Sequence, residues 1–331
     1  MKLALMLPAI PSEKWAVARQ IGVRYAITKL APELTGSLPP WDFDSLLQAK
    51  TRFEDAGFVL YGLEGDEFDM QRIKQGKQGR DEDIEKYSAM LTNMGILGIR
   101  LICVNFMAQI GWMRTSRTTP ERGGARTTSF DADLVSNAPL TEAGIIRDEQ
   151  MWDNLTYFIE AVMPAAEKAG VRIALHPDDP PVSPLRGVAR ILSSARGFRR
   201  ALGICKSPHL GVAFCQANFR LMGEDVRALV REFGGEEKIF YVHFRDVEGT
   251  RERFHETFHD NGPTDMAEML KLYHDVGFDG PIRPDHTPEM EGEGGFSFEA
   301  GTMSAGYEMK GRLFAVGYMR GIMDALHIPV E

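Results

Sequence analysis

Short apolar runs alternate with longer amphipathic segments along the whole chain. Most of these runs are continuously apolar rather than alternating with polar residues, which is typical of parallel strands covered on both faces. We expect eight such strands, at residues 3–7, 25–28, 58–63, 99–106, 171–176, 210–215, 239–244 and 281–285.

The segments between these runs carry apolar residues at the spacing of an amphipathic helix. We expect helices at residues 12–20, 43–56, 82–94, 149–169, 188–194, 224–233, 265–276 and 307–326. Several of them end at a glycine that is followed within a few residues by the next strand, as at Gly57 and Gly170. A series of strand-then-helix units predicts a (β/α)₈ TIM barrel, and a doubly wound open sheet is the alternative. No glycine-rich phosphate loop follows the first strand, so a dinucleotide site there lacks support.

One connection is much longer than a barrel requires. Residues 107–147, rich in Arg, Thr and Gly, follow the fourth expected strand and carry no clear periodicity. A loop of this length is usually functional or disordered, and it emerges at the face where barrel active sites lie. We therefore expect a single barrel domain over residues 1–331, in which this insertion is either a mobile surface segment or a lid over the C-terminal face.

Composition narrows the classes of function. The 331 residues include 38 Lys and Arg against 47 Asp and Glu, a formal net charge of −9. An acidic balance disfavours nucleic-acid and anionic-membrane partners. No apolar stretch approaches the about 18 residues of a membrane-spanning helix, and three irregularly spaced cysteines suit a reducing compartment. We expect a cytoplasmic protein.

The last four expected strands each end in a residue that can bind a metal. His176, Cys215, His243 and Asp285 follow or end these strands. Because the carboxyl ends of neighbouring barrel strands meet on one rim, two imidazoles, a thiolate and a carboxylate should converge there. The thiolate favours Zn²⁺ or Fe²⁺, whereas the carboxylate and an oxygen-rich substrate suit Mn²⁺, so the donor set leaves the metal open.

The same strand ends carry longer motifs that resemble the mannonate dehydratase family of the xylose isomerase-like barrel superfamily. The resemblance rests on His-Pro-Asp-Asp-Pro-Pro at 176–181, Phe-Cys at 214–215, His-Phe-Arg at 243–245, Arg-Pro-Asp-His at 283–286 and Gly-Tyr at 306–307. It runs from about residue 98 to the C-terminus, while the first 97 residues match only in their strand and helix rhythm.

The resemblance implies a hydro-lyase that converts D-mannonate to 2-keto-3-deoxy-D-gluconate in glucuronate catabolism. It implies a divalent metal, Mn²⁺ first, held by His176, Cys215, His243 and Asp285, with His286 and Tyr307 at the reacting carbons. The proton to be removed lies α to a carboxylate, so the intermediate is an enediolate whose extra charge needs a cation beside it. Departure of the 3-hydroxyl needs a general acid, and removal of the α-proton needs a base. His286 and Tyr307 are the candidates for that pair, and their order stays open.

Five further residues are candidates for substrate binding. Arg114 and Arg245 could grip a carboxylate through a bidentate guanidinium. Asn105 could meet sugar hydroxyls, Asp178 could do so or orient His176, and His255 could face the pocket.

Other positions depart from the family pattern, among them Met-Leu-Pro-Ala at 6–9 and Gln216 after Cys215. In such barrels these positions line the substrate pocket, so we expect the metal chemistry to be kept more reliably than the exact substrate. A metal-dependent sugar isomerase or epimerase of the same superfamily is one alternative, and a non-catalytic sugar-acid-binding homologue is another. By analogy with such barrels we expect a homo-oligomer, most simply a dimer.

Overall fold

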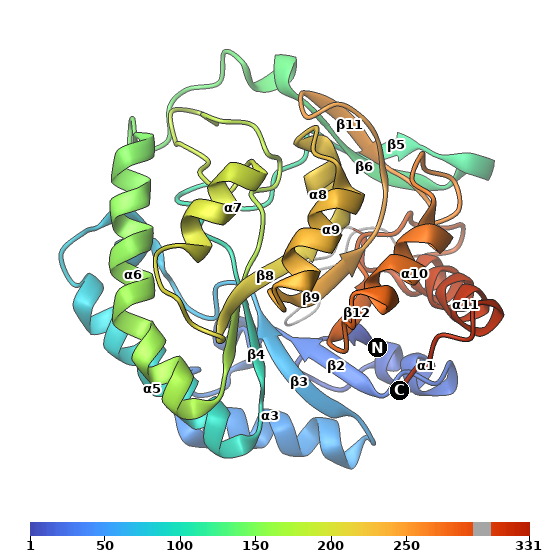
Figure 1. The fold of residues 1–331 in the computed structure, drawn as a ribbon, viewed down its shortest axis with the longest axis horizontal. Coiled ribbons are helices and arrows are strands. Elements are labelled where there is room, and N and C mark those ends of the chain that lie inside the picture. The colour runs from blue at the N-terminus through green and yellow to red at the C-terminus, as the bar shows by residue number, and fades with distance from the viewer. Residues whose placement is uncertain (294–305) are drawn as a thin grey trace.

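The computed structural model describes residues 1–293 and 306–331, and its centre is a closed barrel of parallel strands (Figure 1). The barrel strands are β1 (Lys2–Met6), β2 (Tyr25–Thr28), β3 (Val59–Glu64), β4 (Leu101–Val104), β7 (Arg172–Leu175), β8 (Leu210–Cys215), β9 (Ile239–Phe244) and β12 (Pro281–Pro284). Each pairs in parallel with its neighbours, and β1 pairs with both β2 and β12. Closure confirms the expected barrel and excludes the open sheet.

Helices surround the strands on the outside. They are α1 (Glu13–Gln20), α2 (Pro32–Thr35), α3 (Phe43–Asp55), α4 (Gln71–Gln75), α5 (Arg80–Leu97), α6 (Asp148–Ala169), α7 (Ala195–Leu202), α8 (Gln216–Leu221), α9 (Val226–Gly235), α10 (Met266–Asp275) and α11 (Met309–Ala325). The main hydrophobic core lies between these helices and the strands, and a smaller cluster with Ala174, Ala213 and Tyr241 fills the barrel interior. Gly62 allows a close approach between β3 and β4, since a Cβ there would lie 2.6 Å from the Leu101 carbonyl oxygen.

One expected helix was wrong. Residues 188–194 contain no helix, and α7 begins only at Ala195. The Ser194 side chain accepts a hydrogen bond from the Gly197 amide and so caps α7 at its N-terminus. The preceding apolar residues, Val188, Ile191 and Leu192, are buried without helical backbone. The apolar spacing of residues 188–194 therefore comes from a long loop that is buried, and not from one face of a helix.

Residues 107–147 are more regular than their sequence suggested. They include β5 (Ser116–Pro120) and β6 (Arg126–Asp131), which pair with each other in antiparallel fashion. β6 also pairs with β11 (Arg253–Glu256), which in turn pairs with β10 (Val247–Gly249) from the connection after β9. We call this four-stranded structure the accessory sheet; β5, β6 and β11 lie together at one side of Figure 1. The accessory sheet therefore joins the connection between β4 and α6 to the connection between β9 and α10, which are far apart in the sequence.

The described residues contain no helix that is both long and apolar enough to cross a membrane.

Candidate metal centre and active site

Three potential metal ligands meet at the carboxyl end of the barrel. Cys215 ends β8, His243 lies in β9 and His176 directly follows β7, so the three come from adjacent strands. One ligand atom from each lies within 4.8 Å of the other two. Cys215 and His243 are fully or almost fully buried. The structure thus brings together three of the four ligands expected from the sequence.

Both histidines have their second ring nitrogen placed against an acceptor. Nδ1 of His176 lies 2.6 Å from the Pro177 carbonyl oxygen, to which it must donate, so Nε2 is left with its lone pair. Burial lowers the pKa of His176, which favours the neutral ring that binds metals.

For His243, Nδ1 points to His176, while Nε2 lies 3.3 Å from Glu64 Oε1 and 3.2 Å from a nitrogen of Arg283. A ligand role for Nδ1 requires the proton on Nε2, where Glu64 is the acceptor.

The distance between these nitrogens fits a shared ion. Nε2 of His176 and Nδ1 of His243 are 3.1 Å apart. Two nitrogens that each lie about 2.1 Å from one ion are separated by about 3.0–3.4 Å at right-angled or tetrahedral geometry. The residues present therefore suit a divalent cation.

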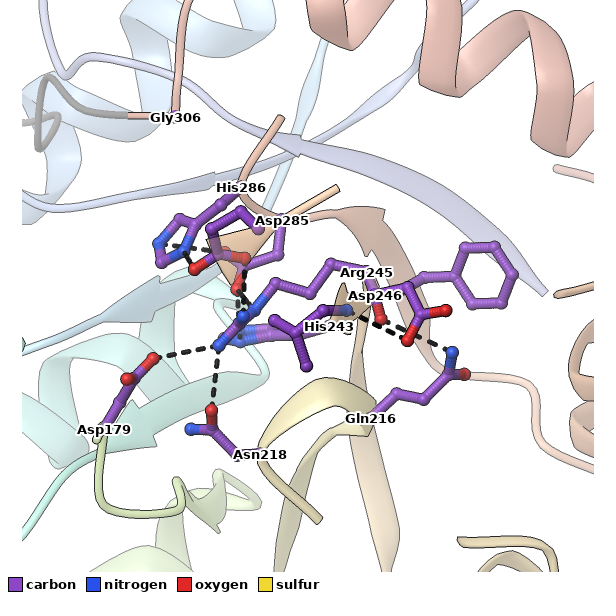
Figure 2. A network of polar contacts seen from close by, with 12 residues as sticks. Asp179, Gln216, Asn218, His243, Arg245, Asp246, Asp285, His286 and Gly306 are labelled. Atoms are coloured by element: carbon purple, nitrogen blue, oxygen red, sulfur yellow. Dashed lines mark hydrogen bonds and ion pairs between the residues drawn. The ribbon is translucent and has the colours of Figure 1, made fainter. Parts of the chain in front are cut away.

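Asp285, the fourth expected ligand, directly follows β12 and lies beside this group. Its Oδ2 is 3.7 Å from Nδ1 of His243 and 2.8 Å from Nε of Arg245. Its Oδ1 forms an ion pair of 2.7 Å with Arg283 and accepts a 2.7 Å hydrogen bond from the Tyr307 hydroxyl. Burial opposes ionisation, but His286, Arg283 and His243 beside the carboxyl hold the pKa of Asp285 well below its usual value. Figure 2 shows Asp285 above Arg245 and next to His286.

A cavity of about 420 Å³ opens over this group. Its wall includes expected site residues and side chains from the first 97 residues. It is lined by Met6, Lys29, Ala31, Glu33, Glu64, Gly65, Asp66, Gln71, Cys103, Asn105, Met107, Gly111, Trp112, His176, Asp179, His243, Asp285, His286 and Tyr307. Carboxylates, two amides, an ammonium group and the aromatic rings of Trp112 and Tyr307 around one cavity suit a polar ligand the size of a sugar acid.

His286 faces this cavity with a buried carboxylate behind it. Nδ1 of His286 lies 3.0 Å from Oε1 of Glu256, a residue of β11. Although burial opposes its ionisation, Arg245, His286 and Arg114 hold the pKa of Glu256 below its usual value. The Trp112 ring packs edge-on against the imidazole at 5.3 Å.

Tyr307 also packs against His286, with ring centroids 5.4 Å apart. Its hydroxyl donates to Asp285 and accepts a 3.1 Å hydrogen bond from Arg283. Burial raises the pKa of Tyr307 well above its usual value, so the hydroxyl keeps its proton at neutral pH.

The two arginines expected to bind substrate lie in a buried ion-pair network. Arg114 pairs with Asp179 and Glu256 at 2.5 Å and 2.6 Å. Arg245 pairs with the same two carboxylates at 2.9 Å and 2.7 Å. It also donates to Asn218 at 2.9 Å, and Figure 2 shows its contacts with Asp179 and Asn218. Neither guanidinium lines the cavity wall formed by the described residues.

The other substrate-binding candidates lie at different places. Asn105 lines the cavity and accepts from Lys74 at 2.9 Å. Asp178 is buried behind the wall, where its Oδ2 accepts from the Leu192 amide, so it secures the loop that carries His176. His255 lies on β11, within 3.8 Å of Glu121 and Glu248, and does not reach the part of the cavity wall that the structure describes.

Sequence reasoning missed several residues of the site. Glu64, Arg283 and Glu256 contact the expected ligands or His286, and Lys29 lines the cavity. Glu64 and Lys29 could have been found by the rule that residues ending barrel strands face the active site, applied to the second and third strands. Glu256 gave no such signal, because its position depends on the pairing of the accessory sheet.

Comparison with solved structures first defines the class. A D-psicose 3-epimerase from Clostridium cellulolyticum, solved with D-tagatose, aligns with a TM-score of 0.61 at 12% identity, over 99% of this chain and 98% of that one. At such identity the likeness shows the fold alone, a TIM barrel. The mannonate dehydratase from Streptococcus suis serotype 2 aligns much better, with a TM-score of 0.88 at 28% identity over 100% of this chain and 97% of that one.

The sequence then identifies the family. The D-mannonate dehydratase (UxuA) family model matches residues 12–147 and 140–329. Mannonate dehydratase 2 of Halalkalibacterium halodurans is 32% identical over 313 residues, which cover 86% of this chain and 88% of that protein. Mannonate dehydratase of Brachyspira hyodysenteriae is 30% identical over 93% of each chain. The chain belongs to the D-mannonate dehydratase family, an enzyme family of hydro-lyases, as the motifs had indicated.

Proposed function

We propose that this protein dehydrates D-mannonate, or a closely related sugar acid, to the 2-keto-3-deoxy acid. The family assignment supports the reaction. The observation that carries it is one cavity whose wall combines potential metal ligands, a histidine backed by a carboxylate and a protonated tyrosine. In this reaction the C2–H bond and the C3–O bond break, water leaves, and the resulting enol becomes the ketone.

We assign the divalent cation to His176, Cys215, His243 and Asp285. A cation held there supplies positive charge next to the substrate carboxylate as negative charge develops at C2. Mn²⁺ is our first choice by family, with Fe²⁺ or Zn²⁺ as alternatives because of the cysteine ligand.

We assign the base to His286. Its Nδ1 faces an ionised carboxylate that can only accept, so in the neutral ring the proton lies on Nδ1. The lone pair is then on Nε2, which is free to take the proton from C2 of the substrate.

We assign the proton donor to Tyr307. Its raised pKa keeps the hydroxyl protonated, and Arg283 donates to the same oxygen and stabilises the charge left behind when the proton is given away. The proton passes to the departing 3-hydroxyl, which leaves as water.

The remaining assignments are based on which residues line the cavity. Asn105 is placed to meet sugar hydroxyls. Arg114 and Arg245 are not assigned to the substrate carboxylate, because their guanidinium groups pair with Asp179 and Glu256. Residues 107–147 cover this face through Gly111 and Trp112 on the wall. A cytoplasmic dimer remains our proposal for the assembled enzyme.

The experiment is a metal-dependence assay. Metal-stripped protein is incubated with D-mannonate, with and without Mn²⁺, and the 2-keto-3-deoxy acid is followed. Product that appears only with metal supports the proposal. Interconversion of a neutral sugar or keto-sugar without loss of water would instead favour the isomerase or epimerase, and binding of the acid without product would favour the non-catalytic homologue.

A further inference from the structure

The accessory sheet contributes a buried carboxylate to the active site. We propose that Glu256 is a positioning residue that fixes the ring orientation and the Nδ1 proton of His286, and that Arg114 and Arg245 hold Glu256 in place for this purpose. The role of His286 as base rests on the proposed function, whereas its contact with Glu256 stands on the geometry alone. Neither the strand-end rule nor the motifs pointed to Glu256.

Both oxygens of Glu256 are engaged. Oε1 lies 3.0 Å from Nδ1 of His286 and accepts a 2.6 Å hydrogen bond from Arg114. Oε2 accepts a 2.7 Å hydrogen bond from Arg245. A carboxylate held at both oxygens cannot rotate away from the imidazole, and Glu256 is only 1% exposed, so water does not compete for it.

The two guanidinium groups are themselves fixed from the opposite side. Arg114 and Arg245 both pair with Asp179, at 2.5 Å and 2.9 Å, so two arginines lie between two carboxylates. Two positive and two negative side chains thus offset one another's charge in this buried group, and Arg245 also pairs with Asp285 at 2.8 Å. The arrangement explains why the guanidinium groups face inward and not toward the cavity.

The His286 ring is also confined by packing. Trp112 lies edge-on against it, and the Arg114 guanidinium covers the Trp112 ring at 4.7 Å. Tyr307 packs on it at an interplanar angle of 86°. With Nδ1 held by Glu256 and two aromatic rings packed against it, the imidazole keeps the orientation in which Nε2 can reach a ligand in the cavity.

These contacts give the accessory sheet a function in catalysis. Glu256 lies on β11, and Trp112 and Arg114 lie in the segment before β5, which begins at Ser116. A barrel strand end supplies His286, but the residues that orient it come from the two connections joined by the sheet. The pairing of β6 with β11 is therefore what brings Arg114 to Glu256.

The test uses the metal-loaded protein and three variants. Glu256→Gln removes the charge, and Glu256→Asp keeps it but withdraws it by one methylene. Glu289→Gln is the matched control, because Glu289 is a buried carboxylate that pairs with Arg126 of β6. We expect Glu256→Gln to lower kcat by at least about 100-fold, in the range of a lost general base. KM and bound metal should stay near the wild-type values, and exchange of the C2 proton with deuterated water should slow in parallel. Glu256→Asp should recover part of kcat, and Glu289→Gln should behave as wild type.

A kcat within about threefold of wild type in a folded, metal-replete Glu256→Gln protein would overturn the proposal, since a lost base costs far more. A fall in kcat explained by lost metal would overturn it as well.

A second measurement needs no substrate, and it uses a variant only to assign the signal. Nitrogen-15 chemical shifts of selectively labelled histidine report which ring nitrogen of His286 carries the proton, with assignment by a His286→Gln spectrum. We expect protonated Nδ1 in the wild-type protein, and an unprotonated Nδ1 would refute the positioning role. If D-mannonate is not turned over but Nδ1 is protonated, the proposed function fails and the role of Glu256 stands.

Discussion

Nε2 of His176 and Nδ1 of His243 face each other at 3.1 Å, and each ring has an oxygen acceptor behind its other nitrogen. The acceptor is the Pro177 carbonyl oxygen for His176 and the Glu64 carboxylate for His243. Such partners fix the ring orientation and the tautomer before the ligand arrives, which raises metal affinity. The arrangement follows from barrel geometry, because β7 and β9 flank β8 and point their carboxyl ends at the same place.

Replacing Cys215 by serine should weaken metal binding strongly. The change removes a thiolate from a buried group of three ligands, and a neutral hydroxyl is a poor replacement. We expect the metal dissociation constant to rise by more than about 100-fold, beyond the effect of losing a supporting residue. Metal content after dialysis measures it. Cys205→Ser, outside the site, is the control, and equal metal retention by both variants would remove Cys215 from the ligand set.

Replacing Glu64 by glutamine should weaken metal binding more moderately. The amide still fits beside His243 but no longer offers a charged acceptor to Nε2. The expected loss is about 10–100-fold in metal affinity, as for other residues that orient a histidine ligand. Competition with a chelating dye measures it. Asp66→Asn, a charge removal on the same cavity wall, should leave metal affinity unchanged, and an equal loss in that variant would point to a general field effect instead.

The sequence was sufficient to predict the barrel and its ligand-bearing rim, because both depend on local patterns. Continuous apolar runs mark buried parallel strands, and polar residues directly after them, as at His176 and Asp285, lie on the rim by topology alone. The helix expected at 188–194 failed because a buried irregular loop carries the same apolar spacing as a helix face. The strands of the accessory sheet escaped notice because Thr-rich, half-exposed strands such as β6 carry no apolar run.

Those site residues that end or directly follow a barrel strand could be predicted from the sequence. What Arg114 and Arg245 bind could not be predicted, because their partners Asp179 and Glu256 come from two other connections. A guanidinium suits a substrate carboxylate and a protein carboxylate equally, and only the fold decides between them. The same reason explains why His255 seemed a candidate while its neighbour Glu256 contacts His286.

A buried glutamic acid outside the metal group should make stability depend on pH. Burial raises the pKa of Glu67 from 4.5 to about 8, and its Oε1 has no hydrogen-bond partner among the described residues. The unfolded chain releases this proton near pH 4.5 and the folded chain only near pH 8, so stability falls as pH rises between these values.

Glu67→Gln should remove this contribution. Relative to wild type, the variant should gain stability from pH 5 to pH 8, with a slope of up to about 1.4 kcal/mol per pH unit. Urea denaturation at several pH values measures the difference. A stability difference that does not change with pH would mean that Glu67 is ionised in the folded protein throughout this range.

Replacing Tyr307 by phenylalanine should stop the reaction without unfolding the protein. The ring and its packing on His286 remain, while the hydroxyl that donates to Asp285 and would protonate the leaving group is lost. We expect kcat to fall by about 10²–10⁴-fold, the usual contribution of a general acid, with metal content unchanged. Exchange of the C2 proton into deuterated water should persist, because His286 is intact. Tyr25→Phe, which removes a hydroxyl bonded to Glu331 at the opposite end of the barrel, is the control. Loss of exchange together with turnover in Tyr307→Phe would assign the base role to Tyr307 and leave His286 as the proton donor.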